Sequence, residues 1–402
     1  MLKVHFLGIG GSGASAAAAI AKSQGYQITG CDLQPRNEFT TPFKDSQLFQ
    51  GHNPEHLENI DILAVTPAIF SLDPENPELA EARKRGIPIM TWQKFLGKYL
   101  AKDKFVIAIA GTHGKTTTTA MIAKILEDAN LDPTVLLGAI VPWWGTNYRL
   151  GKGKAVVIEA DEYNDNFLNF RPDIAVVTNI EMDHPEYFKN FAAVKKSFDQ
   201  FKRQSKKIID QPNPKLIDFP LQIPGDFNIL NASLAYQVGL FLQVDPKIIQ
   251  KSLKNYQGVG RRFELLGEFK GAKIYSDFGH HPTEIKVTME AARQKFPGQR
   301  ILLIYEPHMF TRTYKLFGDF VKVFKEIPID KIIITDIYQS READKGLVNS
   351  KQLVNATEKE NTTYVSKKNL LEKLKNELGK NDVVFFMGAG DIDQLARTNF
   401  LN

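Results

Sequence analysis

Short apolar runs recur along the whole chain, and many of them end in glycine, acidic residues or histidine. Apolar runs of this length, separated by segments with helical spacing, are typical of buried parallel strands that alternate with helices. The pattern predicts strands at residues 3–7, 27–31, 61–65, 87–90, 105–110, 135–138, 155–158, 174–177, 272–276, 301–305, 331–335 and 383–387. It predicts helices at about 12–24, 76–85, 118–126 and 225–242, and another from residue 192. This alternation indicates an α/β protein.

The chain is too long for one ordinary hydrophobic core, because it has 402 residues. A polar, lysine-bearing stretch at 100–104 and a Gly-Val-Gly-Arg-Arg segment at 258–262 interrupt the alternation. We therefore expect three domains, at residues 1–100, 101–258 and 259–402.

Residues 111–117 have the pattern of a phosphate-binding loop. An apolar strand leads into Gly111, Thr112, His113, Gly114, Lys115, Thr116 and Thr117, and a helix follows. Backbone N–H groups at the start of such a helix bind anions, and Lys115 adds a positive charge. The hydroxyl of Thr116 is placed to bind Mg²⁺. The pattern favours a nucleoside triphosphate site over a purely structural glycine turn, although the glycine spacing departs from G-x-x-x-x-G-K-[ST].

Two acidic clusters follow neighbouring apolar strands. Glu159 to Glu162 comes after one strand, and Thr178 to His184 after the other. The carboxyl ends of parallel strands meet at one edge of a sheet, so both clusters are expected beside the phosphate loop. We interpret Glu159 as a Mg²⁺ ligand together with Thr116, and His184 as a ligand of a second ion. A structural, hydrogen-bonded histidine is the alternative for His184.

The first residues form a second phosphate-binding pattern. Gly8, Gly10, Gly11, Ser12 and Gly13 lie between an apolar strand and an alanine-rich helix, and Asp32 follows the next strand. G-x-G-x-x-G with an acidic residue about twenty positions later is typical of Rossmann-like units that bind a diphosphate. The pattern does not identify the diphosphate, and a structural glycine turn is the alternative.

Two groups of residues, near positions 230 and 260, have roles that the sequence pattern alone does not decide. Asn228 and Asn231 lie in the first turns of a predicted helix, where their amides could read a base or cap the helix. Arg261 and Arg262 lie in a glycine-bearing hinge, where both guanidinium groups are available to phosphates.

Composition narrows the class of protein. The net charge is +5 and the basic residues are dispersed, so no nucleic acid partner is needed to explain them. A single cysteine, Cys31, excludes an internal disulfide and fits a reducing compartment. No apolar run approaches a membrane span, and the first residues read as a strand instead of a secretion signal. We expect a cytoplasmic protein.

The economical chemistry for these sites is activation of a carboxylate by ATP, followed by attack of an amine. The pattern alone does not separate this from other phosphoryl transfers. An NAD(P)-dependent dehydrogenase based on residues 8–32 and a ligand-sensing P-loop module without ligase activity are alternatives of other classes.

The chain resembles the Mur ligase family over nearly its whole length. The resemblance is carried by Gly8 to Gly13, Gly111 to Thr119, Glu159 to Glu162, Thr178 to His184, Gly260 to Phe263, Gly279 to Glu284, Pro307 to Thr313 and Met387 to Ile392. It implies a Rossmann-like N-terminal domain for a UDP-sugar, a P-loop central ATPase domain and a Rossmann-like C-terminal domain. The closest likeness is to members that join L-alanine to UDP-N-acetylmuramate; a ligase that recycles murein tripeptide onto the same UDP-sugar is the runner-up.

The resemblance also implies roles for individual residues. Lys115 would contact the phosphates of ATP, and two Mg²⁺ ions would be held by Thr116, Glu159 and His184. The remaining nucleotide contacts would come from Asn228, Asn231, Arg262 and Asp277, and the UDP-sugar contacts from Gly8, Gly10, Gly11, Ser12, Gly13, Asp32 and Thr66. The incoming amino acid and the acyl-phosphate would be held by His281, His308 and Arg312. A monomer or weak dimer is expected.

Three features depart from the family pattern. The region from Lys202 to Pro224 is much shorter than in typical members, which predicts a central domain that lacks part of its peripheral sheet. Phe227 stands where a histidine precedes the adenine-contacting asparagine, and Met309 stands where an arginine is often found. The loss of that guanidinium removes one expected anion contact.

Overall fold

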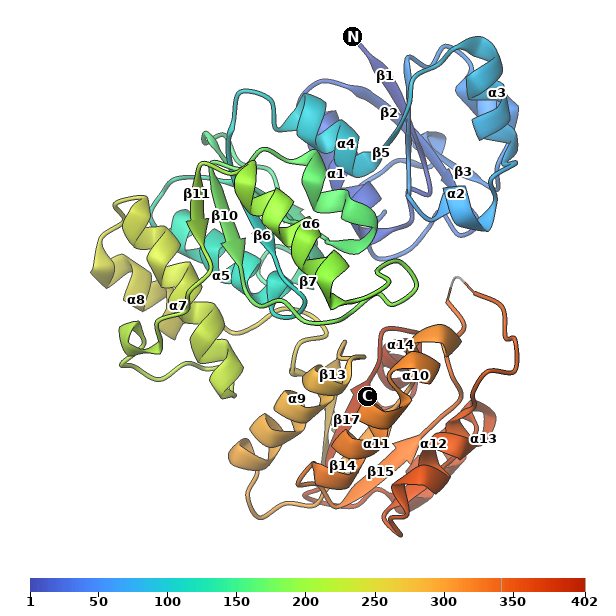
Figure 1. The fold of residues 1–402 in the computed structure, drawn as a ribbon, viewed down its shortest axis with the longest axis vertical. Coiled ribbons are helices and arrows are strands. Elements are labelled where there is room, and N and C mark those ends of the chain that lie inside the picture. Colours follow the sequence, from blue (N-terminus) through green and yellow to red (C-terminus); the bar gives the residue numbers. More distant parts are fainter. Residues whose placement is uncertain (341, 402) are drawn as a thin grey trace. The chain divides into compact units, whose positions relative to one another are not determined.

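The computed structural model describes residues 1–340 and 342–401, which form three α/β domains, each built around its own largely parallel sheet (Figure 1). The chain divides into two compact units. One comprises residues 1–181, 192–219 and 231–254, and the other comprises residues 182–191, 220–230 and 255–402. The first unit contains two of the sheets and the second unit contains the third. The proposed domain bounds of 1–100, 101–258 and 259–402 stay a prediction.

The first sheet has the strand order β3-β2-β1-β4-β5, and all its strand pairs are parallel. Its strands are β1 (Lys3–Leu7), β2 (Gln27–Asp32), β3 (Leu48–Gln50), β4 (Ile62–Val65) and β5 (Ile89–Thr91). Its helices are α1 (Ser12–Ser23), α2 (Ile69–Leu72), α3 (Pro77–Arg85) and α4 (Trp92–Phe95), with short helical turns η1 (Asp45–Gln47), η2 (Pro54–Leu57) and η3 (Leu96–Leu100). Strand order reverses at β1, so the turn after β1 lies at the switch point where such sheets bind ligands.

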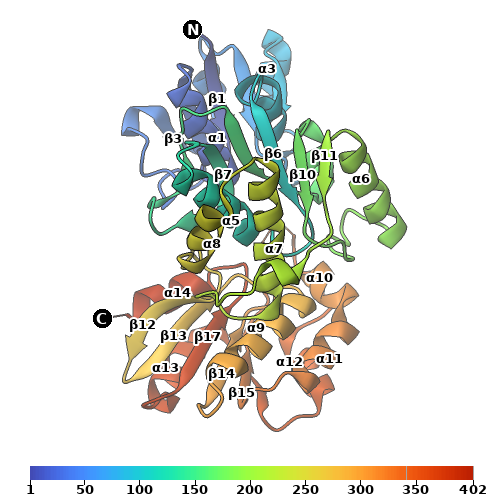
Figure 2. The ribbon, with the colours of Figure 1, turned by 90° about the vertical axis from the view of Figure 1, so that its left-hand side faces the viewer.

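The second sheet has the order β11-β10-β6-β9-β7-β8 and is parallel except for β8. Its strands are β6 (Phe105–Ala110), β7 (Thr134–Val141), β8 (Thr146–Arg149), β9 (Ala155–Glu159), β10 (Ile174–Val177) and β11 (Lys207–Ile209). Its helices are α5 (Lys115–Asp128), α6 (Phe191–Arg203), α7 (Asp226–Phe241) and α8 (Pro246–Lys254), with turns η4 (Tyr163–Asn169) and η5 (Pro214–Leu216). Figure 2 shows α5, α7 and α8 beside this sheet.

Strand β11 ends the second sheet, and no strand follows it before α7. The end of α7 lies beside β11, because Lys207 to Gln211 line a shallow hollow together with Gln237, Leu240 and Phe241. Ile208, Leu240 and Phe241 are all exposed there. The ammonium group of Lys207 lies 5.6 Å from the centre of the Phe241 ring.

The third sheet has the order β12-β13-β17-β14-β15-β16 and is parallel except for β12. Its strands are β12 (Glu264–Phe269), β13 (Ala272–Asp277), β14 (Ile301–Tyr305), β15 (Lys331–Ile334), β16 (Thr362–Tyr364) and β17 (Val383–Met387). Its helices are α9 (Pro282–Lys295), α10 (Phe310–Lys315), α11 (Phe317–Glu326), α12 (Ser350–Thr357), α13 (Lys367–Glu377) and α14 (Ile392–Asn399).

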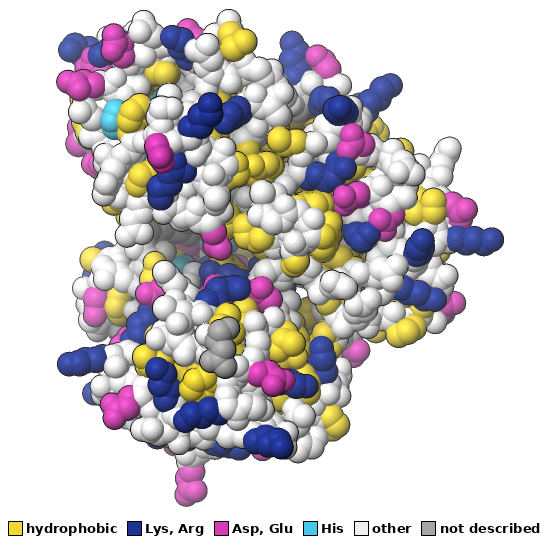
Figure 3. All heavy atoms as spheres, turned by 180° about the vertical axis from the view of Figure 1, so that it is seen from behind, with side chains coloured by type: hydrophobic (Ala, Val, Ile, Leu, Met, Phe, Trp, Pro, Cys, Tyr) yellow, Lys and Arg dark blue, Asp and Glu magenta, His cyan; other side chains and the backbone are white. Residues whose placement is uncertain are grey.

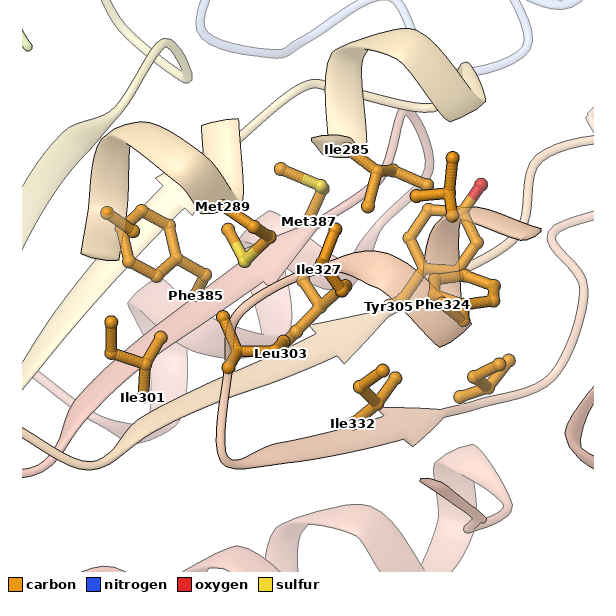
Figure 4. Close-up of a cluster of buried hydrophobic side chains, with 14 of the residues drawn as sticks. Ile285, Met289, Ile301, Leu303, Tyr305, Phe324, Ile327, Ile332, Phe385 and Met387 are labelled. Carbon is orange, nitrogen blue, oxygen red and sulfur yellow. The ribbon is translucent and has the colours of Figure 1, made fainter. Parts of the chain in front are cut away.

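Buried side chains cover both faces of the third sheet. On one face Ile285 and Met289 of α9 and Phe324 of α11 pack on residues of β14 and β17, including Leu303 and Phe385 (Figure 4). The other face packs against α13 and α14 through Leu370, Leu374, Ile392 and Ala396. Burial on both faces explains why these strands read as unbroken apolar runs in the sequence.

All predicted strands are present, and their ends differ from the predicted ones by at most a few residues. The helix predicted at 118–126 is longer, because α5 begins at Lys115 inside the glycine turn. Strands β3, β8, β11, β12 and β16 were not predicted.

The surface matches the composition. Basic and acidic side chains are interspersed over the face of the molecule in Figure 3. No helix in the described residues has both the length and the apolar character that crossing a membrane requires.

Candidate active site

The turn between β6 and α5 can be built only with glycine at two positions. Gly111 has φ +140° and Gly114, which precedes α5, has φ +84°. A Cβ on Gly111 would lie 2.0 Å from Oγ1 of Thr178, and one on Gly114 would lie 2.5 Å from Oδ1 of Asn231. Among the described residues, no side chain of the N-cap residue Gly114 caps α5, and the N-terminus of a helix favours an anion.

The turn is held in place by residues that follow β10. Asn179 accepts a hydrogen bond from the backbone N–H of Thr112 through its carbonyl oxygen (3.1 Å) and one from that of His113 through its side chain (2.9 Å). The amide of Asn179 donates to the carbonyl of His113 (3.0 Å), and the N–H of Glu181 donates to Oγ1 of Thr112 (2.8 Å). The turn is therefore preorganised by its neighbouring strand.

Oxygen atoms of the backbone and of a carboxylate surround the ammonium group of Lys115. Its ammonium group donates to the carbonyl oxygens of Gly111 and Thr112 and lies 2.8 Å from Oε2 of Glu162. Burial alone would lower the pKa of Lys115, but the carboxylates of Glu162 and Asp161 outweigh it and raise the pKa above its usual value. Lys115 therefore carries its charge at the loop.

Thr116 and Glu159 supply adjacent oxygen donors. The Thr116 hydroxyl donates to Oε1 of Glu159 (2.9 Å), and Oε2 of Glu159 accepts from the N–H of Gly138 (2.6 Å). A hydroxyl and a carboxylate beside a phosphate-binding turn are the donor types that Mg²⁺ prefers. The residues present therefore fit a magnesium ion. Sequence reasoning assigned no role to Glu162 or Asn179, although both stand in the strand-end segments that it singled out.

The predicted UDP-sugar residues surround the turn after β1. Gly11 precedes α1 and Ser12 is its first residue, and within the described part of the chain the N-cap position makes no side-chain hydrogen bond. The N–H of Gly10 donates to Oδ2 of Asp32 (3.0 Å). Added Cβ atoms would lie 2.5 Å from the Thr66 side chain at Gly8 and 2.3 Å from the Trp92 ring at Gly13. The structure thus brings Gly8, Gly10, Gly11, Ser12, Gly13, Asp32 and Thr66 together.

Asn228 and Asn231 both lie on α7. The amide of Asn228 donates to the carbonyl of Pro224 (2.6 Å), and the side chain of Asn231 lies against the turn at Gly114.

Asp277 and Arg262 meet in the second compact unit. Asp277 accepts hydrogen bonds from the N–H groups of Phe263 (2.9 Å) and Gly279 (2.8 Å). Burial raises the pKa of Asp277 to about 6, against the opposing charge of Arg262. The Arg262 guanidinium also lies 5.1 Å from the centre of the Phe278 ring.

A second group in the same unit gathers around Arg312, which is almost wholly buried. Its Nε and Nη2 both donate to Oδ1 of Asp183, at 3.2 and 3.0 Å, and its Nη1 lies 3.3 Å from Nδ1 of His308. Burial opposes ionisation of Asp183, but the charges of His184 and Arg312 outweigh it and hold its pKa well below the usual range. The sequence analysis gave Asp183 no role.

The histidines of this unit have defined partners. Nδ1 of His184 lies 3.2 Å from Oε1 of Glu186. Nδ1 of His281, the residue before α9, accepts from the N–H of Thr283 (3.2 Å). Burial, together with the charge of Arg312, lowers the pKa of His280 to about 4, so this imidazole is neutral near pH 7.

Comparisons with known proteins agree along the chain. Residues 3–104 match the Mur ligase family, catalytic domain; residues 109–210 match the Mur ligase middle domain; and residues 261–390 match the Mur ligase, glutamate ligase domain.

Curated relatives cover nearly the whole chain. The UDP-N-acetylmuramate–L-alanine ligase of Aquifex aeolicus is 35% identical over 443 positions, which cover 98% of this chain and 96% of that protein. The enzyme of the same name from Caldanaerobacter subterraneus is 36% identical, over 97% of this chain and 95% of that protein. The 443 aligned positions exceed the 402 residues of the chain, so the Aquifex protein has residues with no counterpart here.

Solved structures of related ligases also resemble this chain over nearly its whole length. UDP-N-acetylmuramate–alanine ligase from Thermotoga maritima superimposes with a TM-score of 0.82 at 26% identity, covering 99% of this chain and 98% of that one. A murein peptide ligase from Psychrobacter arcticus shares the fold, with a TM-score of 0.71 at 21% identity over 100% of this chain and 99% of that one. Three Mur ligase domains match one after another along the chain, and relatives are more than 30% identical to it over almost its full length. The chain therefore belongs to the Mur ligase family.

Proposed function

We propose that this protein uses ATP to join L-alanine to the carboxylate of UDP-N-acetylmuramate, a step in the synthesis of the peptidoglycan precursor. The observation that carries the proposal is the charged phosphate loop around Lys115, found in a chain that is 35% identical to ligases of that name along nearly its whole length. A parallel-sheet domain with a second glycine turn, after β1, supplies the place for the UDP group.

The chemistry proceeds in two transfers. A carboxylate oxygen of UDP-N-acetylmuramate attacks the γ-phosphorus of ATP, and ADP leaves, which forms an acyl-phosphate. The amine of L-alanine then attacks the acyl carbon, and the tetrahedral intermediate collapses to an amide and inorganic phosphate. Lys115 and the N-terminus of α5 offset the negative charge that develops on the transferred phosphoryl group.

Mg²⁺ ions would screen phosphate charge when bound. Thr116 and Glu159 would hold the first, because their oxygens already meet at 2.9 Å. His184 would serve a second. Asn228, Asn231, Arg262 and Asp277 would contact the nucleotide.

The second compact unit would bind the amino acid. Arg312 keeps a permanent charge beside His308, and His281 lies at the N-terminus of α9. We assign these residues to the carboxylate of L-alanine and to the acyl-phosphate. Met309 is buried and offers no charge, so amino-acid recognition would rest on Arg312 and the histidines.

The test is phosphate release from ATP and Mg²⁺ in the presence of UDP-N-acetylmuramate. L-Alanine, glycine, L-serine and the murein tripeptide are added one at a time, with Lys115→Ala as the inactive control. Release that needs both the UDP-sugar and L-alanine is expected. Release with the tripeptide alone would move the protein to murein recycling, and no release with any acceptor would overturn the proposal.

A further inference from the structure

Four potential metal ligands converge in the first domain, next to the glycine turn after β1, whose Gly8 and Ile9 N–H groups donate to the backbone carbonyl of Cys31. His5 lies on β1, Cys31 on β2, His56 on η2 and Glu78 on α3. One ligand atom from each lies within 4.8 Å of the ligand atoms of the other three. Strands β1 and β2 and helix α3 lie together in the blue part of Figure 1.

The distances from the Glu78 carboxylate to the other three ligands are slightly shorter than those of a tetrahedral zinc site, and all four ligand atoms lie within 4.8 Å of one another. Oε1 of Glu78 lies 2.9 Å from Nδ1 of His56 and 3.1 Å from Sγ of Cys31, and Oε2 lies 3.2 Å from Nε2 of His5. Zinc bonds of about 2.0 Å to nitrogen and oxygen and about 2.3 Å to sulfur place tetrahedral ligands roughly 3.3–3.6 Å apart. Small outward shifts of these side chains would therefore admit the ion.

The burial and the charge of these side chains also favour a zinc ion. His5, Cys31 and Glu78 are fully buried, and His56 is the solvent-side member, with a side chain that is 14% exposed. One thiolate and one carboxylate together neutralise a divalent cation, which removes the penalty of burying a net charge. A thiolate and two imidazoles select zinc over magnesium, which prefers oxygen.

The first of these ligands is already oriented as a metal-binding histidine would be. Nδ1 of His5 lies 2.8 Å from the hydroxyl of Thr29, which turns Nε2 toward Glu78. Nε2 of His5 is fully buried and, within the part of the chain that the structure describes, makes no hydrogen bond despite its short distance to Glu78. The His56 ring is stacked on Phe49 with centroids 4.4 Å apart.

We propose that His5, Cys31, His56 and Glu78 bind one zinc ion in a structural site. Binding exchanges the thiol proton of Cys31 for the metal, so a Zn–S bond forms and one proton is released to solvent. Four protein ligands close the tetrahedron, which makes the site structural and not catalytic. The ion would tie together β1, β2, η2 and α3. The zinc proposal does not rest on the proposed ligase activity.

The competing interpretation is a metal-free cluster in which Glu78 accepts hydrogen bonds from the thiol of Cys31, from histidine and from the backbone N–H of Asn53. Cobalt distinguishes the two, because a thiolate bound to Co²⁺ gives a charge-transfer absorption in the near ultraviolet. Cys31 is the only cysteine of the chain, so that absorption reports this site alone, and a magnesium site made of oxygen ligands does not produce it.

The experiment uses the full-length protein, stripped of metal and kept in excess Mg²⁺. One equivalent of Co²⁺ should produce the thiolate band, and one equivalent of Zn²⁺ should abolish it by displacement. Cys31→Ser should lose the band, and His56→Gln should weaken zinc binding by more than roughly tenfold. His52→Gln is the matched control, because Nδ1 of His52 lies 3.3 Å from Sγ of Cys31 but outside the ligand set. Because His52 contacts a ligand and is not a ligand itself, its loss should reduce zinc affinity less than His56→Gln does.

A second readout needs no variant. One equivalent of Zn²⁺ should raise the thermal midpoint and slow the reaction of Cys31 with a thiol reagent, both in excess Mg²⁺. Absence of the cobalt band, together with an unchanged midpoint, would overturn the proposal. A loss of affinity in His52→Gln as large as in His56→Gln would overturn the choice of ligands.

Discussion

Lys115 carries its charge where its ammonium group donates to the carbonyl oxygens of Gly111 and Thr112 and to the carboxylate of Glu162. We predict that Lys115→Met lowers turnover by more than about a hundredfold, because the transferred phosphoryl group loses its charged partner. Phosphate release measures this. Lys124→Met is the control, because Lys124 lies on the same helix but pairs with Asp128, and it should keep near-normal activity. Substantial ligation by Lys115→Met would remove this lysine from the reaction.

Glu306 introduces a pH dependence of folding. It follows β14, is fully buried, and is paired with Lys367. Burial raises the pKa of Glu306 to about 7 despite the opposing effect of Lys367. A carboxyl whose pKa is higher in the folded state than in the unfolded state binds a proton on folding. Its contribution to the stability of the folded state is therefore fully present below about pH 4.5 and is lost as the pH rises toward 7.

We predict that Glu306→Gln removes this dependence. Relative to the variant, the wild-type protein should lose stability between about pH 5 and pH 8, by at most about 3 kcal/mol. Thermal midpoints of the two proteins across this range measure the effect. A difference between them that does not change with pH would contradict the assignment.

At the scale of elements, the start of helix α5 depends on a backbone that only glycine adopts easily. We predict that Gly114→Ala destabilises the fold by about 1–2 kcal/mol and abolishes nucleotide binding, because the new Cβ meets Asn231. Gly298→Ala is the control, since nothing lies within 4 Å of a Cβ there and its φ is ordinary. Calorimetric titration with a non-hydrolysable ATP analogue tests both; binding by Gly114→Ala would contradict the prediction.

The segment 182–191 is fastened to α10 by the buried pair of Asp183 and Arg312. We predict that Asp183→Asn lowers the free energy of unfolding by about 3–5 kcal/mol, because it leaves the buried guanidinium without its counter-charge. Urea denaturation measures this. Lys206→Met, which removes the exposed partner of a surface pair with Asp173, should change stability by less than about 1 kcal/mol. Equal effects of the two changes would refute the argument.

Elements buried on both faces could be predicted from sequence, and short edge strands could not. Strands β14 and β17 are continuous apolar runs because helices cover both sides. Strands β3, β11 and β16 have three residues each and mixed exposure, so they show no periodicity. Their pairing depends on neighbours supplied by the fold.

The candidate site divides in the same way. Glycine turns and strand ends are local features, so Gly8 to Gly13, Gly111 to Thr117 and Glu159 could be read from the chain. The pairing of Lys115 with Glu162 and of Arg312 with Asp183 joins segments distant in sequence. The same holds for the cluster around Glu78. Such contacts are set by tertiary packing, and spacing along the chain does not reveal them.

At the scale of the whole molecule, the chain consists of two compact units. We predict that heat unfolds them in separable steps, so that the calorimetric enthalpy exceeds the van't Hoff enthalpy. A non-hydrolysable ATP analogue with Mg²⁺, at about a hundred times its dissociation constant, should stabilise the nucleotide-binding part by about 2.7 kcal/mol. Scanning calorimetry with and without the analogue measures both, and a single transition with equal enthalpies would contradict the prediction.

Strand β11 is an edge strand of the second sheet, which has a consequence for self-association between copies of the protein. A sheet edge with unpaired N–H and C=O groups can recruit a strand from another molecule and begin an aggregate. Here the edge strand is three residues long, begins with Lys207 directly after Lys206, and has the exposed side chain of Ile208 at its centre. The short length of this strand and the positive charge of its lysines therefore disfavour pairing with another molecule. For this reason the chain, which is shorter than its relatives, resists fibrillar stacking although it has no extra strands that cover the sheet.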